Sequence, residues 1–238
     1  MLMVLVVLSL LVGNLTAIAQ TNIKRMLAFS TISQMGFVLI GMLSGVTNGN
    51  TLSAANAYSS AMFYMISYVL TTLGVFGVIL LLAREGFESE EISDLAGLNQ
   101  RSPLFAGVMA ICLFSLAGVP PLVGFFAKLS VLQALVASEQ ISALVLAVFA
   151  VIMSLVGAFY YLRVIKVMYF DPPLTVSTVS ADTHVKAVLA VNGGLVLVLG
   201  CCLECSALAA ESSLFQDSCS HSAWISGERT AHRWAECF

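Results

Sequence analysis

Charged residues are scarce in this sequence, and their scarcity excludes most soluble proteins. Of the 238 residues only 10% are charged and 59% are hydrophobic, and the mean hydropathy is +0.98. Soluble domains carry about 25% charged residues, so this chain has too little polar surface to stay dissolved. No charge occurs in the 58 residues between Arg25 and Arg84, a stretch long enough for two bilayer crossings. The composition therefore predicts an integral membrane protein.

The sequence also lacks the patterns of several other functional classes. No basic tract with interleaved aromatic residues is present, which argues against a nucleic-acid partner. It contains no glycine-rich phosphate loop, nucleophile elbow or pair of intramembrane carboxylates, so we expect no redox cofactor site in this chain. Six cysteines include the cluster CCLEC at 201–205, but a metal site needs a repeated, well-spaced pair of ligand pairs. No bound metal is therefore expected.

Apolar runs separated by polar turns predict an all-α fold, a polytopic transmembrane helix bundle. A crossing needs roughly 20 apolar residues, because the hydrocarbon core is about 30 Å thick. The turn TNGN at 47–50 divides the uncharged stretch, and the charged segment 84–103 reads as a solvated connection with a short surface helix. The polar, aperiodic residues 204–238 form a tail that we expect to be disordered. The six predicted spans are 1–18, 26–45, 55–83, 104–137 (broken at 118–121), 141–169 and 186–203.

The positive residues near the predicted spans favour one orientation. Seven of them fall on one side of the membrane, namely Lys24, Arg25, Arg84, Arg101, Arg163, Lys166 and Lys186. The other side has only Arg229 and Arg233, far from any span. Because loops rich in lysine and arginine stay in the cytoplasm, we expect cytoplasmic basic loops and both termini outside.

Lys128 is the one ionisable residue well inside a predicted span. A charge at the centre of a bilayer costs about 2.5–3.5 kcal/mol on insertion scales, so it usually faces a partner or a water-filled cavity. The alternative is a lysine that snorkels to the membrane surface near a helix end. Position alone leaves both interpretations open.

A predicted helix break precedes Lys128 and favours the functional interpretation. The break contains Gly118, Pro120, Pro121 and Gly124. The two prolines lack N–H groups, so carbonyls in the turn before them lose their helical partners. Such groups are tolerated in hydrocarbon only where protein or water satisfies them, and a broken helix beside an ionisable residue is a recurring ion site in transporters. A purely structural kink remains the alternative.

Hydroxyl and amide side chains in two other spans form a candidate water or proton path. Ser30, Ser33 and Gln34 are spaced i, i+3, i+4 and share one helix face, and Tyr64 and Tyr68 share another. These groups both donate and accept hydrogen bonds, as a water path requires. The alternative is that they join neighbouring helices.

Three segments carry a family resemblance: AQTNIKRMLAFSTISQMGF (19–37), SPLFAGVMAICLFSLAGVPPLVGFFAKLSVLQALV (102–136) and YYLRVIKVMY (160–169). They resemble the antiporter-like membrane subunits of respiratory complex I, the NADH–quinone oxidoreductase. The likeness covers residues 1 to about 200. It implies the second of two inverted five-helix repeats plus the final helix, with Lys128 on the functional lysine of the second broken helix.

The resemblance implies a proton-translocating membrane subunit, in which quinone reduction elsewhere in the complex drives proton movement. NADH, FMN, iron–sulfur clusters and the quinone would then lie on other parts of the complex. The partners would be other membrane subunits and the lipid bilayer. The location would be the bacterial inner membrane, with both termini in the periplasm.

The chain also departs from the family pattern. Gln34 stands where many relatives carry a histidine, so a group that can only hydrogen-bond replaces a proton carrier. The first repeat is absent, and the likeness stops after about Gly200, as a split subunit or a truncated gene with a shifted reading frame would explain. Two other functions stay open: a subunit of a related multi-subunit sodium/proton antiporter or membrane-bound hydrogenase, or a fragment that transports nothing.

Overall fold

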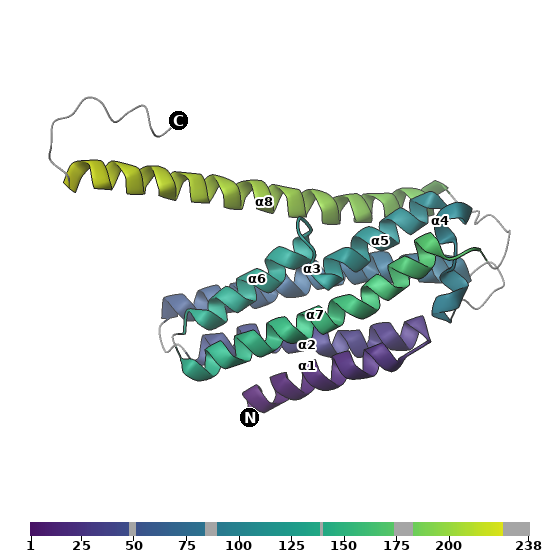
Figure 1. The fold of residues 1–238 in the computed structure, drawn as a ribbon, viewed down its shortest axis with the longest axis horizontal. Helices are drawn as coiled ribbons and strands as arrows, with labels where there is room; N and C mark the ends of the chain where they lie inside the picture. The colour runs from purple at the N-terminus through teal and green to yellow at the C-terminus, as the bar shows by residue number, and fades with distance from the viewer. Residues whose placement is uncertain (48–50, 84–89, 139, 174–182, 226–238) are drawn as a thin grey trace. The chain divides into compact units, whose positions relative to one another are not determined.

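The computed structural model describes residues 1–47, 51–83, 90–138, 140–173 and 183–225. Within these ranges the regular structure is helical and no strand is assigned, which confirms the all-α prediction (Figure 1). The elements are α1 (Leu2–Ala19), α2 (Ile23–Thr47), α3 (Thr51–Ala83), the 3-10 helix η1 (Ile92–Leu95), α4 (Leu98–Arg101), α5 (Pro103–Ala117), α6 (Val123–Val136), α7 (Ile141–Phe170) and α8 (Thr183–Ile225).

Membrane-spanning length separates these helices into two kinds. Five of the described helices, α1, α2, α3, α7 and α8, are long and apolar enough to cross a bilayer. α5 and α6 have 15 and 14 residues, so each is only about 21–23 Å long, shorter than a hydrocarbon core of about 30 Å. They follow one another along one line of the bundle (Figure 1) and together make one broken crossing. The prediction of a polytopic helix bundle is confirmed, and the break predicted at 118–121 lies between α5 and α6.

Close contacts between helices hold the bundle together. In a bilayer, association depends on tight packing and polar contacts, because lipid tails are as apolar as leucine. At Gly13 a Cβ atom would lie 2.6 Å from the backbone nitrogen of Ser33, so α1 and α2 touch through their backbones. Outward-facing residues such as Leu80 and Leu155 are apolar and about two-thirds exposed, at 67% and 68%, as a lipid-facing surface requires.

The segment between α3 and α5 is less solvated than predicted. Residues 84–89 lie outside the described residues, but Ile92, Leu95 and Leu98 are buried in the same core cluster as parts of α2 and α7. Ile92 and Leu95 are three residues apart and lie on one side of the 3-10 helix η1, and Leu98 is the first residue of α4. The expectation of a solvated connection is therefore wrong for these residues, because their apolar side chains fill the end of the bundle.

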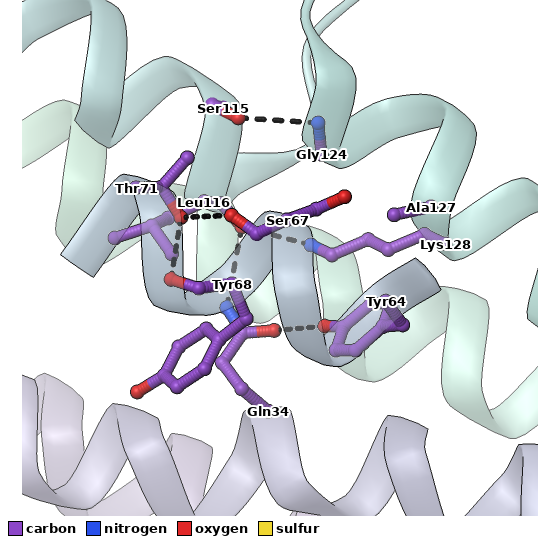
Figure 2. A pocket seen from close by; sticks show the side chains of 10 residues that line it. All are labelled: Gln34, Tyr64, Ser67, Tyr68, Thr71, Ser115, Leu116, Gly124, Ala127 and Lys128. Atoms are coloured by element: carbon purple, nitrogen blue, oxygen red, sulfur yellow. Dashed lines mark hydrogen bonds between the residues drawn. The ribbon is translucent and has the colours of Figure 1, made fainter. Parts of the chain in front are cut away.

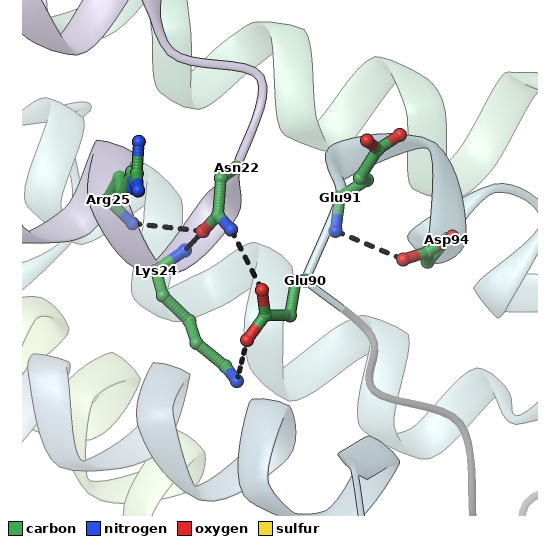
Figure 3. A network of polar contacts seen from close by, with 6 residues as sticks. All are labelled: Asn22, Lys24, Arg25, Glu90, Glu91 and Asp94. Atoms are coloured by element: carbon green, nitrogen blue, oxygen red, sulfur yellow. Dashed lines mark hydrogen bonds and ion pairs between the residues drawn. The ribbon is translucent and has the colours of Figure 1, made fainter.

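A polar network fixes this segment to the start of α2 (Figure 3). Asn22 caps α2, since its Oδ1 accepts hydrogen bonds from the backbone N–H groups of Lys24 (3.0 Å) and Arg25 (3.2 Å). Its Nδ2 donates to Glu90 Oε2 at 3.3 Å, and Lys24 Nζ forms an ion pair with Glu90 Oε1 at 3.0 Å. The hydrogen bond from Lys24 holds the pKa of the Glu90 carboxyl below its ordinary value.

The chain divides into two compact units, Met1–Cys201 and Cys202–Phe238. α8 continues past the predicted span end at residue 203 and reaches Ile225. The prediction of an irregular tail is therefore wrong for residues 204–225, which contain no proline or glycine and many good helix formers such as alanine, leucine and glutamate. Residues 226–238 lie outside the described residues, as do most of the predicted turn at 47–50 and most of the linker before α8.

Candidate functional site

The break between α5 and α6 begins with a left-handed glycine. Gly118 has φ 86°, a conformation that glycine adopts without steric cost. Its N–H donates to Ser115 O at 3.0 Å, and the N–H of Val119 donates to Phe114 O at 3.1 Å. This pair of bonds is the Schellman motif that ends many helices. It satisfies two carbonyls of α5 and leaves those of the next two residues without a helical partner.

Lys128 supplies the donors that the proline pair lacks. In a continuous helix, the N–H groups of residues 120 and 121 would donate to the carbonyls of Leu116 and Ala117, but both positions are proline. Lys128 Nζ reaches back from α6 and donates to Leu116 O at 2.9 Å and Ala117 O at 3.0 Å. The lysine thus occupies the two acceptors that the break opens.

Two further residues complete the surroundings of the ammonium group. Nζ donates its third hydrogen bond to Ser154 Oγ on α7, at 3.0 Å. It also lies 5.5 Å from the centre of the Phe37 ring, within the range of a cation–π contact. The stem passes so close to Gly118 that a Cβ there would lie 3.1 Å from Lys128 Cδ. Because Nζ ends on acceptors of α5 and α7, the snorkelling interpretation does not describe this side chain.

The first turn of α6 packs directly against the end of α5. The backbone N–H of Gly124 donates to Ser115 Oγ at 3.1 Å (Figure 2). A Cβ on Gly124 would overlap the carbonyl oxygen of Ser115. Only glycine permits this approach, and the approach brings Lys128, one helical turn later, within reach of the freed carbonyls.

Gln34 on α2 is a second donor to one of the carbonyl groups that Lys128 contacts. Its Nε2 donates to Leu116 O at 3.3 Å, so this carbonyl is shared with Lys128, and also to Tyr161 Oη at 3.2 Å. Its Oε1 accepts a hydrogen bond from the Tyr64 hydroxyl on α3, as Figure 2 shows. The amide therefore links α2, α3, α5 and α7 around one carbonyl.

A small cavity lies beside the lysine, in the region drawn in Figure 2. Its volume of about 10 Å³ is room for about one water molecule. Most of the lining residues carry hydroxyl, amide or amine groups that a water could join by hydrogen bonds. The lining residues are Gln34, Tyr64, Ser67, Tyr68, Thr71, Ser115, Leu116, Gly124, Ala127 and Lys128.

The predicted path residues are brought together only in part. Gln34, Tyr64 and Tyr68 line the cavity, and the Tyr68 hydroxyl donates to Thr31 Oγ1 at 2.7 Å. Ser30 and Ser33 are not among the lining residues. Ser30 donates to Leu27 O at 3.0 Å, and Ser33 lies in the contact between α1 and α2.

Sequence reasoning missed three polar residues that extend the network away from the cavity. Tyr161 accepts from Gln34, and its ring centre lies 4.5 Å from that of Tyr160. The Tyr160 hydroxyl donates to Asn14 Oδ1 on α1 at 3.2 Å. Asn14 is 1% exposed and is the only amide side chain within the first apolar run, a signal that could have singled it out. The two tyrosines gave no such signal, because aromatic residues are common in apolar helices.

Comparison with known proteins assigns the family. The family described as NADH:quinone oxidoreductase/Mrp antiporter, TM matches residues 1–154. The chain belongs to this family. The matched region contains the broken helix, Lys128 and Ser154. Membership of the NADH:quinone oxidoreductase/Mrp antiporter family confirms the resemblance that the sequence motifs indicated.

Individual relatives of the NADH:quinone oxidoreductase/Mrp antiporter family place the chain more narrowly. It is 70% identical over 194 residues to NADH-quinone oxidoreductase subunit N of Polaromonas naphthalenivorans (strain CJ2), an alignment that covers 81% of this chain and 39% of the relative. Respiratory complex I from Thermus thermophilus, solved with bound aureothin, is 28% identical, with a TM-score of 0.67 and coverage of 84% and 42%. The Mrp complex from Dietzia sp. DQ12-45-1b is 21% identical, with a TM-score of 0.71 and coverage of 85% and 44%, and shows the shared fold.

The chain spans about two fifths of the length of the curated relatives it matches. It is a multi-pass membrane protein and is similar to a membrane subunit of an oxidoreductase complex.

Proposed function

We propose that this chain works in a proton-translocating membrane subunit of NADH–quinone oxidoreductase, with Lys128 as the residue that takes up and releases the proton. The observation that carries the proposal is the contact set of Lys128 Nζ, which rests on two carbonyls freed by prolines and on a hydroxyl from another helix. A cation held by neutral acceptors inside a membrane is a costly arrangement that usually marks an ion or proton pathway. The 70% identity to a subunit N points to the same activity.

Among the polar groups at the site, the amine of Lys128 is the one suited to carrying a proton. Backbone carbonyls and the Gln34 amide hydrogen-bond but do not titrate in the physiological range, and a tyrosine hydroxyl ordinarily ionises only near pH 10. A proton on a water in the adjacent cavity would pass to Nζ as an N–H bond forms and the O–H bond breaks. Release would reverse these steps. Ser67, Thr71 and Ser115 are among the residues that line that cavity, and their hydroxyls would orient the water.

The setting follows from the same assignment. The chain would sit in a bacterial inner membrane with other membrane subunits of the complex, its basic loops in the cytoplasm and the N-terminal end of α1 in the periplasm. NADH, FMN, iron–sulfur clusters and quinone would be bound by other parts of the complex. This chain would then be the proton-moving part of a translocase, driven by redox chemistry that occurs elsewhere.

The test uses proton pumping by the assembled complex in inverted membrane vesicles supplied with NADH. We expect Lys128→Ala to lower the pumping rate by at least about tenfold, because the relay group is lost. Lys128→Arg keeps a charged donor near the freed carbonyls but cannot release its proton, so the complex should assemble and still fail to pump. Lys166→Ala, at an exposed position on α7, is the matched control and should pump normally.

Normal pumping by Lys128→Ala would overturn the proposal and favour a fragment that transports nothing. The sodium/proton antiporter alternative shares the fold, but the likeness to the Mrp complex is only 21% in sequence. NADH-driven pumping that depends on Lys128 separates the two, because an antiporter subunit would show exchange of sodium for protons without NADH.

A further inference from the structure

Ser154 uses its hydroxyl differently from several other serines in these helices. Ser44, Ser67 and Ser130 donate to a carbonyl of their own helix, to Ile40 O (2.8 Å), Phe63 O (2.8 Å) and Ala127 O (3.0 Å). Such back-bonding is the ordinary way for serine to satisfy its hydrogen inside a helix. Ser154, on α7, instead accepts a hydrogen bond from Nζ of Lys128 on the neighbouring helix α6.

The three partners of Lys128 Nζ differ in what they can do when the lysine changes charge. A protonated lysine has three N–H donors, whereas a neutral lysine has two N–H donors and one lone pair. The carbonyls of Leu116 and Ala117 only accept, so they suit two N–H groups in either state. The third position must accept from the charged form and donate to the neutral form. A hydroxyl group does both.

We propose that Ser154 is a positioning residue that holds Lys128 in place in both charge states, an inference that rests on the proposed function. In the charged state Ser154 Oγ accepts an N–H bond from Nζ. To reach a water of the adjacent cavity, the ammonium group rotates about the Cε–Nζ bond, so that one N–H leaves its acceptor and donates to that water. The proton then passes to the water, as this N–H bond breaks and an O–H bond forms on the water. The neutral amine turns back, so that its two remaining N–H groups donate to the two carbonyls, and the Ser154 hydroxyl turns to donate to the lone pair while keeping its own hydrogen.

The arrangement of the site supports separate places for holding and for exchange. Ser154 comes from α7, whereas the residues lining the cavity come from α2, α3, α5 and α6. Ser154 therefore contacts Lys128 Nζ through its hydroxyl but is not among the residues that line the cavity. Without the Ser154 hydroxyl, the charged lysine would have one N–H without an acceptor. The neutral lysine would have a lone pair without a donor. Leaving a buried polar group unpaired shifts an equilibrium by about fivefold or more.

A pair of variants of equal shape isolates the hydroxyl. Threonine and valine differ at this position only by one hydroxyl in place of one methyl group. We expect Ser154→Thr to keep most of the NADH-driven pumping and Ser154→Val to lose about fivefold or more, with equal amounts of assembled complex. Ser130→Ala, whose hydroxyl bonds within α6, is the control and should pump normally. Should the valine variant fail to assemble, Ser154→Ala compared with Ser154→Thr gives the same contrast.

Two results would overturn the inference. Equal pumping by the threonine and valine variants, whether both high or both low, would show that the hydroxyl does not matter. The Lys128→Ala variant, measured in the same vesicles, separates this from a failure of the proposed function. If Lys128→Ala abolishes pumping while Ser154→Val does not, only the role of Ser154 is wrong.

Discussion

Replacing Gly124 with alanine is expected to destabilise the junction between α5 and α6. The new Cβ would overlap Ser115 O and lie 2.7 Å from the carbonyl carbon and 2.9 Å from Oγ of the same residue. Two of these three atoms belong to the backbone of α5, so they cannot rotate away as a flexible side chain would. The two helices must move apart, and the hydrogen bond from Gly124 N to Ser115 Oγ is then lost.

The size of the effect follows from three contributions. Overpacking costs about 1–3 kcal/mol, and the lost hydrogen bond costs about 0.5–1.5 kcal/mol. Alanine regains up to about 1 kcal/mol, because it favours a helix over glycine. The net loss is about 0.5–4.5 kcal/mol. For a chain of this size, such a loss lowers the melting temperature by about 1–18 °C.

Gly107 provides a matched control within α5, because a Cβ there would meet nothing within 4 Å. Thermal unfolding of the purified protein in detergent should therefore show Gly124→Ala melting clearly below the unaltered protein, and Gly107→Ala melting at the same temperature or slightly above. If the two variants melt together, the close approach of α6 to Ser115 is wrong, and with it the explanation for how Lys128 reaches the carbonyls of α5.

Two further predictions concern contacts away from the site. Asn192→Leu removes the hydrogen bond from Nδ2 to Leu70 O (3.1 Å) and should lower the stability of the bundle by about 0.6–1.7 kcal/mol, measured by thermal unfolding; an unchanged melting temperature would contradict the contact between α8 and α3. Lys24→Gln should raise the pKa of Glu90, because Lys24 holds it low. The stability that such an ion pair contributes is fully present above the ordinary pKa of a carboxyl, and it is lost as the pH falls through the lowered pKa. NMR titration of a labelled Glu90 should therefore show a higher midpoint in the variant than in the unaltered protein.

The features that depend on backbone chemistry could be predicted from the sequence. The number of crossings follows from uncharged runs, and the break follows from prolines that carry no N–H. The need for a donor near residues 116 and 117 is a consequence of the same two prolines, and Lys128 is the one cation nearby in the sequence. The prolines, the freed carbonyls and Lys128 all lie within one short stretch of sequence, so this part of the site could be predicted from it.

The partners that come from distant helices could not be predicted. Gln34 and Leu116 are 82 residues apart in the chain, and Gln34 and Tyr161 are 127 apart. Only the packing of α2 against α5 and α7 brings them together, and no local pattern encodes that packing. The burial of Ile92 and Leu95 was missed for a similar reason, because the charges around them resemble those of a solvated loop. Residues 204–225 show no hydrophobic periodicity that would indicate a helix, and only their helix propensity favours the one that forms there.

The proline pair and Lys128 form one hydrogen-bonding unit, whose donor and acceptors lie 11 and 12 residues apart. An engineer who replaced both prolines to make α5 and α6 one straight helix would restore two backbone donors, and these would take the carbonyls that now hold the ammonium group. Replacing the prolines would therefore straighten the helix and also leave the Lys128 ammonium group without these two acceptors. The break between α5 and α6 and the buried charge of Lys128 therefore depend on each other, and neither can be changed while the other is kept.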